Sequence, residues 1–180
     1  MSKELHLLIL KSKKRNKKAQ LKLYELFCEA MFFISCRYLK NEEEAKDAMQ
    51  DAFLKAFLSI DSYKDDTSFG SWLKRIVINT CIDKLKKIEI KTVSIENYPL
   101  ELIEDDNWNF NSKIGKEEII IAIENLKLKY QLVVKLYLIE GYDHEEISEI
   151  LKIPVKTSRT QLRRGKLALR NLLKNEEYGT

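Results

Sequence analysis

The chain has 180 residues, of which 44% are hydrophobic and 33% are charged, and its formal net charge is +4 at pH 7. This length suits one medium domain or two small ones, and the composition excludes a disordered tail. Five glycines and two prolines leave little material for hairpin turns, so the runs rich in Lys, Glu, Leu, Ile and Ala predict an all-α protein.

The apolar stretches of the first half are too short to cross a membrane. Residues 30–36 form its longest uncharged apolar run, whereas a transmembrane helix needs about 20 such residues. The apolar residues 5–10 precede the basic cluster 11–18, the reverse of the order in a signal peptide, and no small-residue cleavage site follows them. We therefore expect a cytoplasmic protein without membrane insertion.

Three cysteines, Cys28, Cys36 and Cys81, lie in apolar helical stretches, without CxxC spacing and without a histidine at ligand distance. This pattern predicts buried thiols in a reducing compartment, with a redox switch as the alternative. It indicates neither a metal site nor a cofactor.

Two helices are predicted next, at about 19–40 and 42–60, the second capped by Asn41. The second helix has one continuous apolar stripe that can join a core. A second stripe, rotated from the first, mixes polar residues with leucines and favours a protein partner, although a solvated helix is the alternative. The second stripe consists of Asp47, Gln50, Asp51, Leu54 and Leu58.

A polar loop at 61–70 precedes a third helix at about 71–88. The polar face of this helix carries Arg75 and Asn79, with Lys74 beside them. Aromatic residues next to a basic helix suit single-stranded DNA, because every base offers a face for stacking. The same aromatic residues can instead belong to the core.

Periodicity is lost over residues 92–111, which contain Pro99 and the acidic run 96–106, so this segment predicts a linker. Two further helices are expected at about 116–128 and 130–140, the latter ending at Gly141. The predicted organisation is two small helical domains, 1–90 and 116–180, joined by an acidic linker at 91–115.

Residues 141–173 have the pattern of a helix-turn-helix. Asp143 and Glu146 can form a capping box, and Pro154 suits the first position of the second helix. The outward face of that helix is basic and rich in hydroxyls near its N-terminus, as a recognition helix in the major groove requires. A charged surface helix is the alternative. The candidate DNA-contacting residues are Lys156, Thr157, Ser158, Arg159, Thr160, Gln161, Arg163 and Arg164.

Four segments together resemble the extracytoplasmic-function (ECF) group of bacterial sigma factors. Residues 43–53 resemble the polymerase-binding helix of that group and 69–80 its promoter-opening helix. Residues 140–147 and 154–162 are similar to its C-terminal helix-turn-helix. Departures are Lys152 and Lys156, where members often have Gly, and Lys127, where they often have Pro. These departures bear on the turn geometry and on the −35 sequence preference.

The resemblance implies a role for each surface. The second stripe would dock on core RNA polymerase, and the recognition helix would read the −35 element. The acidic linker would thread toward the catalytic cleft. An anti-sigma factor is a further partner that the resemblance allows, and catalysis would belong to the polymerase. The implied −10 contacts are Tyr63, Lys64, Asp65, Thr67 and Ser68, which would capture a flipped base, together with Lys74, Arg75 and Asn79.

Two other functions compete with this interpretation. A non-sigma helix-turn-helix regulator would need a sensor or dimerisation domain, and residues 1–88 lack the alternating strand–helix pattern of a receiver. An enzyme is disfavoured because the two histidines, His6 and His144, do not have HExxH spacing and no Gly-rich phosphate loop is present.

Overall fold

Helices make up most of the part of the chain that the computed structural model describes, residues 3–91 and 115–177. No strand occurs within those ranges. The chain divides into two compact units, an N-terminal unit (residues 1–95) and a C-terminal unit (residues 96–180). The all-α, two-domain prediction is therefore confirmed, whereas the predicted acidic linker lies almost wholly outside the described residues.

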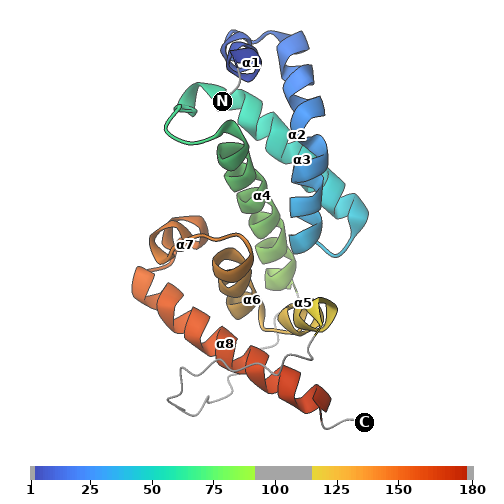
Figure 1. Cartoon of the computed structure of the whole chain (residues 1–180), viewed down its shortest axis with the longest axis vertical. Helices are drawn as coiled ribbons and strands as arrows, with labels where there is room; N and C mark the ends of the chain where they lie inside the picture. Colours follow the sequence, from blue (N-terminus) through green and yellow to red (C-terminus); the bar gives the residue numbers. More distant parts are fainter. Residues whose placement is uncertain (1–2, 92–114, 178–180) are drawn as a thin grey trace. The chain divides into compact units, whose positions relative to one another are not determined.

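Three long helices form the body of the N-terminal unit (Figure 1): α2 (Lys17–Tyr38), α3 (Glu42–Leu58) and α4 (Phe69–Lys91). The Asn16 and Asn41 side chains cap α2 and α3 by accepting backbone N–H groups of the first turn. The apolar stripe of α3 is rich in alanine and buried except for the half-buried Phe57, so α3 can pack closely against α2 and α4.

A helix that the sequence pattern did not predict precedes these three. It is α1 (Lys3–Lys13), which packs against α2. A short 3-10 helix, η1 (Ile60–Ser62), follows α3 and contacts α1 as well. The basic cluster 11–18 thus belongs to the end of α1, the turn after it and the start of α2, and it lies near the segment that follows α3.

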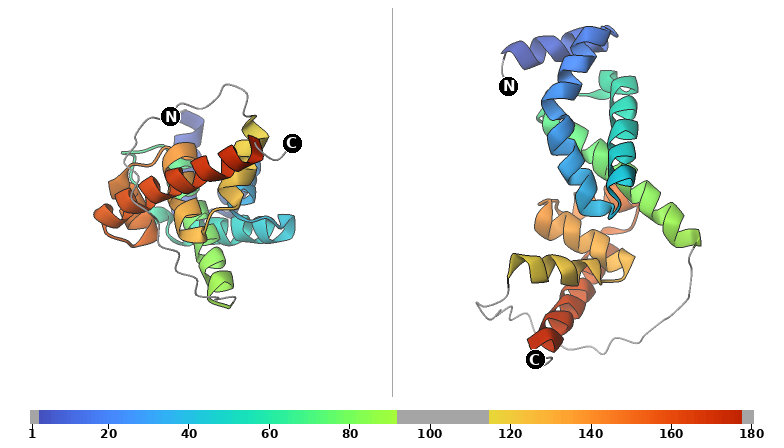
Figure 2. Two further views of the ribbon diagram at one scale, coloured as in Figure 1. Left: turned by 90° about the horizontal axis from the view of Figure 1, so that it is seen from below. Right: turned by 90° about the vertical axis from the view of Figure 1, so that its right-hand side faces the viewer.

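The C-terminal unit contains α5 (Lys116–Glu124), α6 (Leu128–Val134), α7 (His144–Leu151) and α8 (Val155–Glu177). Figure 2 shows α8 crossing α5 and α6, both of which it contacts. A side chain at Gly165 of α8 would place its Cβ 2.7 Å from Val134 Cγ2. Glycine therefore lets α6 approach α8 more closely than any other residue would allow.

The helix predicted at 130–140 begins earlier and changes its winding. After α6 the backbone passes into a π-helical turn, η2 (Lys135–Ile139), which ends before the left-handed Gly141 (φ 79°). Lys135 and Leu136 of this turn are buried, whereas Tyr137, Leu138 and Ile139 are exposed. The wider turn divides its side chains between the core and the surface.

The prediction of three buried thiols is wrong for two of them. Only Cys81 is buried; Cys28 is half-buried and Cys36 is exposed. Burial raises the pKa of the Cys81 thiol to about 11, which makes it a poor nucleophile. Among the described residues, no helix is long and apolar enough to cross a membrane.

Candidate functional site

The second stripe of α3 lies on the surface, as its spacing predicted. Asp47, Gln50 and Asp51 are exposed, and the exposed fractions of Leu54 and Leu58 are 63% and 77%. Since the alanine-rich stripe already fills the core, these leucines are not needed to fold the unit. An apolar pair ringed by polar side chains is the composition expected of a binding surface.

The loop between η1 and α4 is closed by one of its own side chains. Tyr63 is buried, and its hydroxyl donates to the Thr67 carbonyl at 2.9 Å. Burial, followed by the Asp65 and Asp66 carboxylates, raises the pKa of Tyr63 above its ordinary value, so the hydroxyl keeps its proton and this hydrogen bond. Tyr63 therefore shapes the loop from inside, and it is also one of the residues that line the cavity beside the loop.

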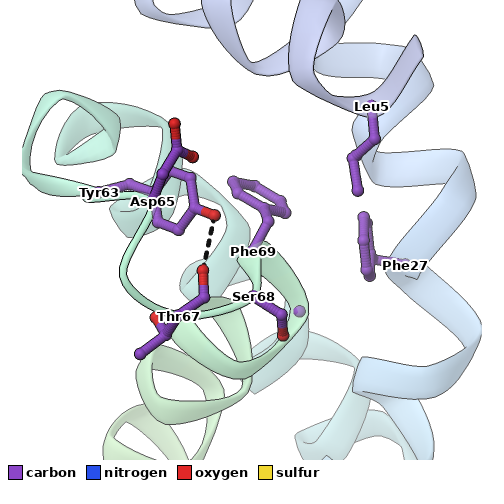
Figure 3. Close-up of a pocket in the computed structure, with 8 residues that line it drawn as sticks. Leu5, Phe27, Tyr63, Asp65, Thr67, Ser68 and Phe69 are labelled. Atoms are coloured by element: carbon purple, nitrogen blue, oxygen red, sulfur yellow. Dashed lines mark hydrogen bonds between the residues drawn. The ribbon is translucent and has the colours of Figure 1, made fainter. Parts of the chain in front are cut away.

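A cavity of about 420 Å³ opens beside this loop. In Figure 3, Leu5 of α1 and Phe27 of α2 lie on one side of it, and the loop residues lie on the other. Its remaining lining residues are Tyr63, Asp65, Thr67, Ser68, Phe69 and Gly70. The structure thus brings together Tyr63, Asp65, Thr67 and Ser68, which the sequence predicted as site residues, and adds Leu5 and Phe27, which it did not predict as site residues.

Aromatic rings pack behind the cavity wall. Phe69 is buried and lies 5.4 Å, centroid to centroid, from each of Tyr63, Trp72 and Phe27. Phe69 therefore belongs to the core, which was one of the two interpretations of the aromatic residues near α4, and it also lines the cavity. Lys64 is exposed on the loop, and Lys74, Arg75 and Asn79 are half-buried along α4.

The helix-turn-helix has the predicted caps. The Asp143 carboxylate accepts from the Glu146 N–H at 2.8 Å, and the Glu146 carboxylate accepts from the Asp143 N–H at 3.0 Å, so the capping box is confirmed. Pro154 lies just before α8 rather than at its first position, and its carbonyl accepts from the Ser158 N–H. Lys152 ends α7 in the left-handed region, at φ 57° and ψ 48°.

Replacing Lys152 with glycine is expected to stabilise the C-terminal unit by roughly 0.5–1 kcal/mol. A side chain with a Cβ is strained at this φ, and glycine relieves the strain despite the greater entropy of the unfolded chain. Hydrogen exchange of the α7 and α8 amides in the full chain measures the free energy of opening. Faster exchange in Lys152→Gly would contradict this prediction.

The exposed face of α8 is basic, as predicted, but one of the residues predicted to lie on it is buried. Lys156, Arg159, Thr160, Arg163 and Arg164 are exposed, and Thr157 and Gln161 are half-buried. Ser158 is fully buried, so placing it on the outward face was wrong. Together with Leu162, Gly165 and Leu169 it follows the inward i, i+4, i+7 spacing of the helix.

The buried Ser158 hydroxyl contacts the first residue of α7. Its oxygen lies 2.9 Å from His144 Nδ1, and the His144 ring stacks on Tyr137 with centroids 5.0 Å apart. His144 thus joins the two helices of the motif to the π-helical turn. Among the described residues, no three His, Cys, Asp or Glu side chains are grouped so that they could hold a metal ion.

Two helical units, the second a helix-turn-helix whose second helix has an exposed basic face, form an architecture typical of DNA-binding transcription factors. The family model "Sigma-70 region 2" matches residues 23–89, and "Sigma-70, region 4" matches residues 116–169. The chain is 30% identical over 174 residues to the ECF RNA polymerase sigma factor SigW of Bacillus subtilis, covering 91% of this chain and 93% of SigW.

A second relative agrees with this match, and a solved structure agrees with the fold. The ECF RNA polymerase sigma-E factor of Escherichia coli K12 is 26% identical over 147 residues, covering 75% of this chain and 76% of that protein. The sigma factor RpoE of Bartonella quintana, solved in complex with the anti-sigma factor NepR, superposes with a TM-score of 0.58 at 20% identity, covering 85% of this chain and 95% of that one. The chain belongs to the sigma-70 family, in its ECF group, a family of transcription factors rather than catalytic enzymes.

Proposed function

We propose that this chain is an alternative sigma factor that binds core RNA polymerase in the cytoplasm, directs it to promoters through the −35 and −10 elements, and assists DNA melting. The observation that carries the proposal is the exposed basic face on the first turns of α8. Arginine can bridge two acceptors on guanine, and lysine and threonine hold phosphates. Since NepR binds a sigma factor of similar fold, an anti-sigma factor is a further partner in this proposal.

The N-terminal unit supplies the −10 contacts in this proposal. The cavity beside the loop is lined by the polar residues Asp65, Thr67 and Ser68 and by the apolar residues Leu5, Phe27 and Phe69. Lys64, Lys74, Arg75 and Asn79 would hold the DNA backbone and neighbouring bases. Tyr63 supports the loop from inside, and the second stripe of α3 docks on the polymerase.

In vitro transcription from a random-promoter library, with purified core polymerase and this chain, tests the proposal. Enrichment of two sequence elements at the spacing of −10 and −35 is the expected result. A helix-turn-helix regulator that is not a sigma factor would leave core polymerase unable to initiate at any enriched sequence, and this outcome would contradict the proposal.

Polymerase docking predicts a selective effect of Leu54→Ala. Because Leu54 is exposed and off the core stripe, the variant should fold normally yet bind core polymerase more weakly, by about 1–3 kcal/mol for a leucine buried in the interface. Titration of labelled chain with core polymerase measures this. Leu21→Ala, at an exposed leucine of α2, is the matched control. Equal affinity of the Leu54→Ala variant and the wild-type chain would contradict the docking surface.

A further inference from the structure

The N-terminal helix α1 lies outside residues 23–89, which the region 2 model matches, yet it contacts the loop at several points. Resting on the proposed capture of a −10 base, we propose that α1 is part of the base-binding site. In this proposal Leu5 forms a wall that contacts the captured base, and Lys13 and Arg15 are positioning residues that hold the loop in its binding shape.

Basic side chains at the C-terminal end of α1 hold the segment after α3. Lys13 Nζ donates to the Tyr63 carbonyl at 2.9 Å and lies 5.8 Å from the centre of the Tyr63 ring. Arg15, in the left-handed turn that follows α1, donates to the Phe57 carbonyl and to Asp61 at 2.8 Å. These bonds hold the last turn of α3, the middle of η1 and Tyr63 at the start of the loop.

The same helix reaches the cavity itself. Leu5 lines it opposite the loop, and His6 Nδ1 lies 3.8 Å from Oδ2 of Asp65, another lining residue. Tyr63, held by Lys13, packs edge-on against Phe69, which also lines the cavity. Movement of α1 would therefore change one wall directly and the opposite wall through Tyr63.

The shape and chemistry of the cavity suit an unstacked nucleobase. Its volume falls within the roughly 300–1,000 Å³ of small-ligand pockets. Leu5, Phe27 and Phe69 offer apolar and aromatic surface to the faces of a ring. Asp65, Thr67 and Ser68 are polar lining residues of the cavity. The Ser68 hydroxyl accepts from the Ser71 N–H at 3.1 Å and bonds the Ser71 hydroxyl, which leaves it capacity for one further hydrogen bond to the edge of a base. A phosphate is disfavoured there, because the Asp65 and Asp66 carboxylates repel it.

A nearby glycine keeps this space open. A Cβ on Gly70 would lie 3.2 Å from Phe27 Cε1, so a side chain at position 70 would press on the ring that faces the loop. The walls contributed by α1, α2 and the loop therefore enclose a single space, which α1 helps to define.

The test uses this chain bound to core polymerase and a single-stranded oligonucleotide carrying the −10 sequence enriched from the random library. Each base in turn is replaced by an abasic residue, which identifies the captured position by its loss of affinity. Leu5→Ala should weaken binding of the intact oligonucleotide by about threefold to tenfold. The same variant should change binding by less than twofold when the captured base is absent, since Leu5 then has no base to contact.

Leu7→Ala is the matched control, because Leu7 is an exposed leucine of α1 that does not line the cavity. Leu5→Met, which keeps the apolar volume, should retain most of the affinity and shows that the helix is intact. An equal loss with the intact and the abasic oligonucleotide would overturn the role of Leu5. If no abasic position weakens binding by the wild-type chain, base capture itself fails, which is a different result.

Lys13→Met tests the positioning role, with the exposed Lys14→Met as control. Lys13→Met should reduce by about threefold the gain in affinity that the captured base gives over the abasic oligonucleotide. The salt dependence of binding should stay unchanged, because Lys13 contacts the loop and not a phosphate. A lower salt slope with unchanged base dependence would show that Lys13 binds DNA directly, and would overturn its positioning role.

Discussion

Replacing Lys135 with methionine is expected to destabilise the C-terminal unit by about 2–3 kcal/mol. The Lys135 ammonium donates to Glu124 Oε1 at 2.5 Å, with only 4% of the Lys135 side chain exposed. Gln131 donates to the other Glu124 oxygen at 3.1 Å. Removing one partner of a buried ion pair leaves the other charge poorly compensated. The effect should lie below the usual range for buried pairs, because 25% of the Glu124 side chain is exposed.

A double variant distinguishes the contribution of the ion pair to stability from that of side-chain packing. Glu124→Gln combined with Lys135→Met removes both charges and keeps the side-chain volumes, so it should recover at least half of the lost stability. Hydrogen exchange of the α6 and α8 amides in the full chain measures each free energy of opening. If the double variant is as unstable as the sum of the two single variants, the ion pair is not what stabilises this unit.

Sequence patterns predicted the elements whose signals are local. Asn41 predicted the start of α3, and the apolar stripe predicted its buried face. Asp143 and Glu146 predicted the start of α7. The exposure of Leu54 and Leu58 followed from the same periodicity, because a helix that already fills the core with one face must turn its other residues outward.

Features that depend on tertiary contacts were missed. The apolar residues of α1 are nearly contiguous, so they showed no helical period, and only the contact with α2 reveals their role. Lys135 and Glu124 are residue types usually found on the surface, and nothing in the sequence pairs them. Ser158 lies among basic residues and was placed with them, although its spacing to Leu162 and Leu169 indicates the inward face.

Reading of the −35 element by α8 predicts different effects for its arginines and its lysine. Arg163 is exposed, and Arg159, four residues earlier on the same face, lies 3.7 Å from Glu145. Arg163→Ala is expected to cost about 1–3 kcal/mol in binding and to relax the preference at one base pair, because no other side chain bridges guanine O6 and N7 as arginine does. Arg159→Ala should act in the same direction but less strongly, since DNA must first draw Arg159 away from Glu145.

Lys156→Ala is the matched comparison, because Lys156 is exposed at the start of α8 and suits a phosphate contact. It should weaken binding to all sequences alike and lower the salt-dependence slope by roughly 0.9 for one lost contact. Titrations at several salt concentrations, on the enriched −35 duplex and its single-base variants, distinguish the two roles. If Arg163→Ala, Arg159→Ala and Lys156→Ala all change only the salt slope, then α8 holds the DNA backbone without reading bases. The −35 preference would then arise from the sequence-dependent shape of the DNA.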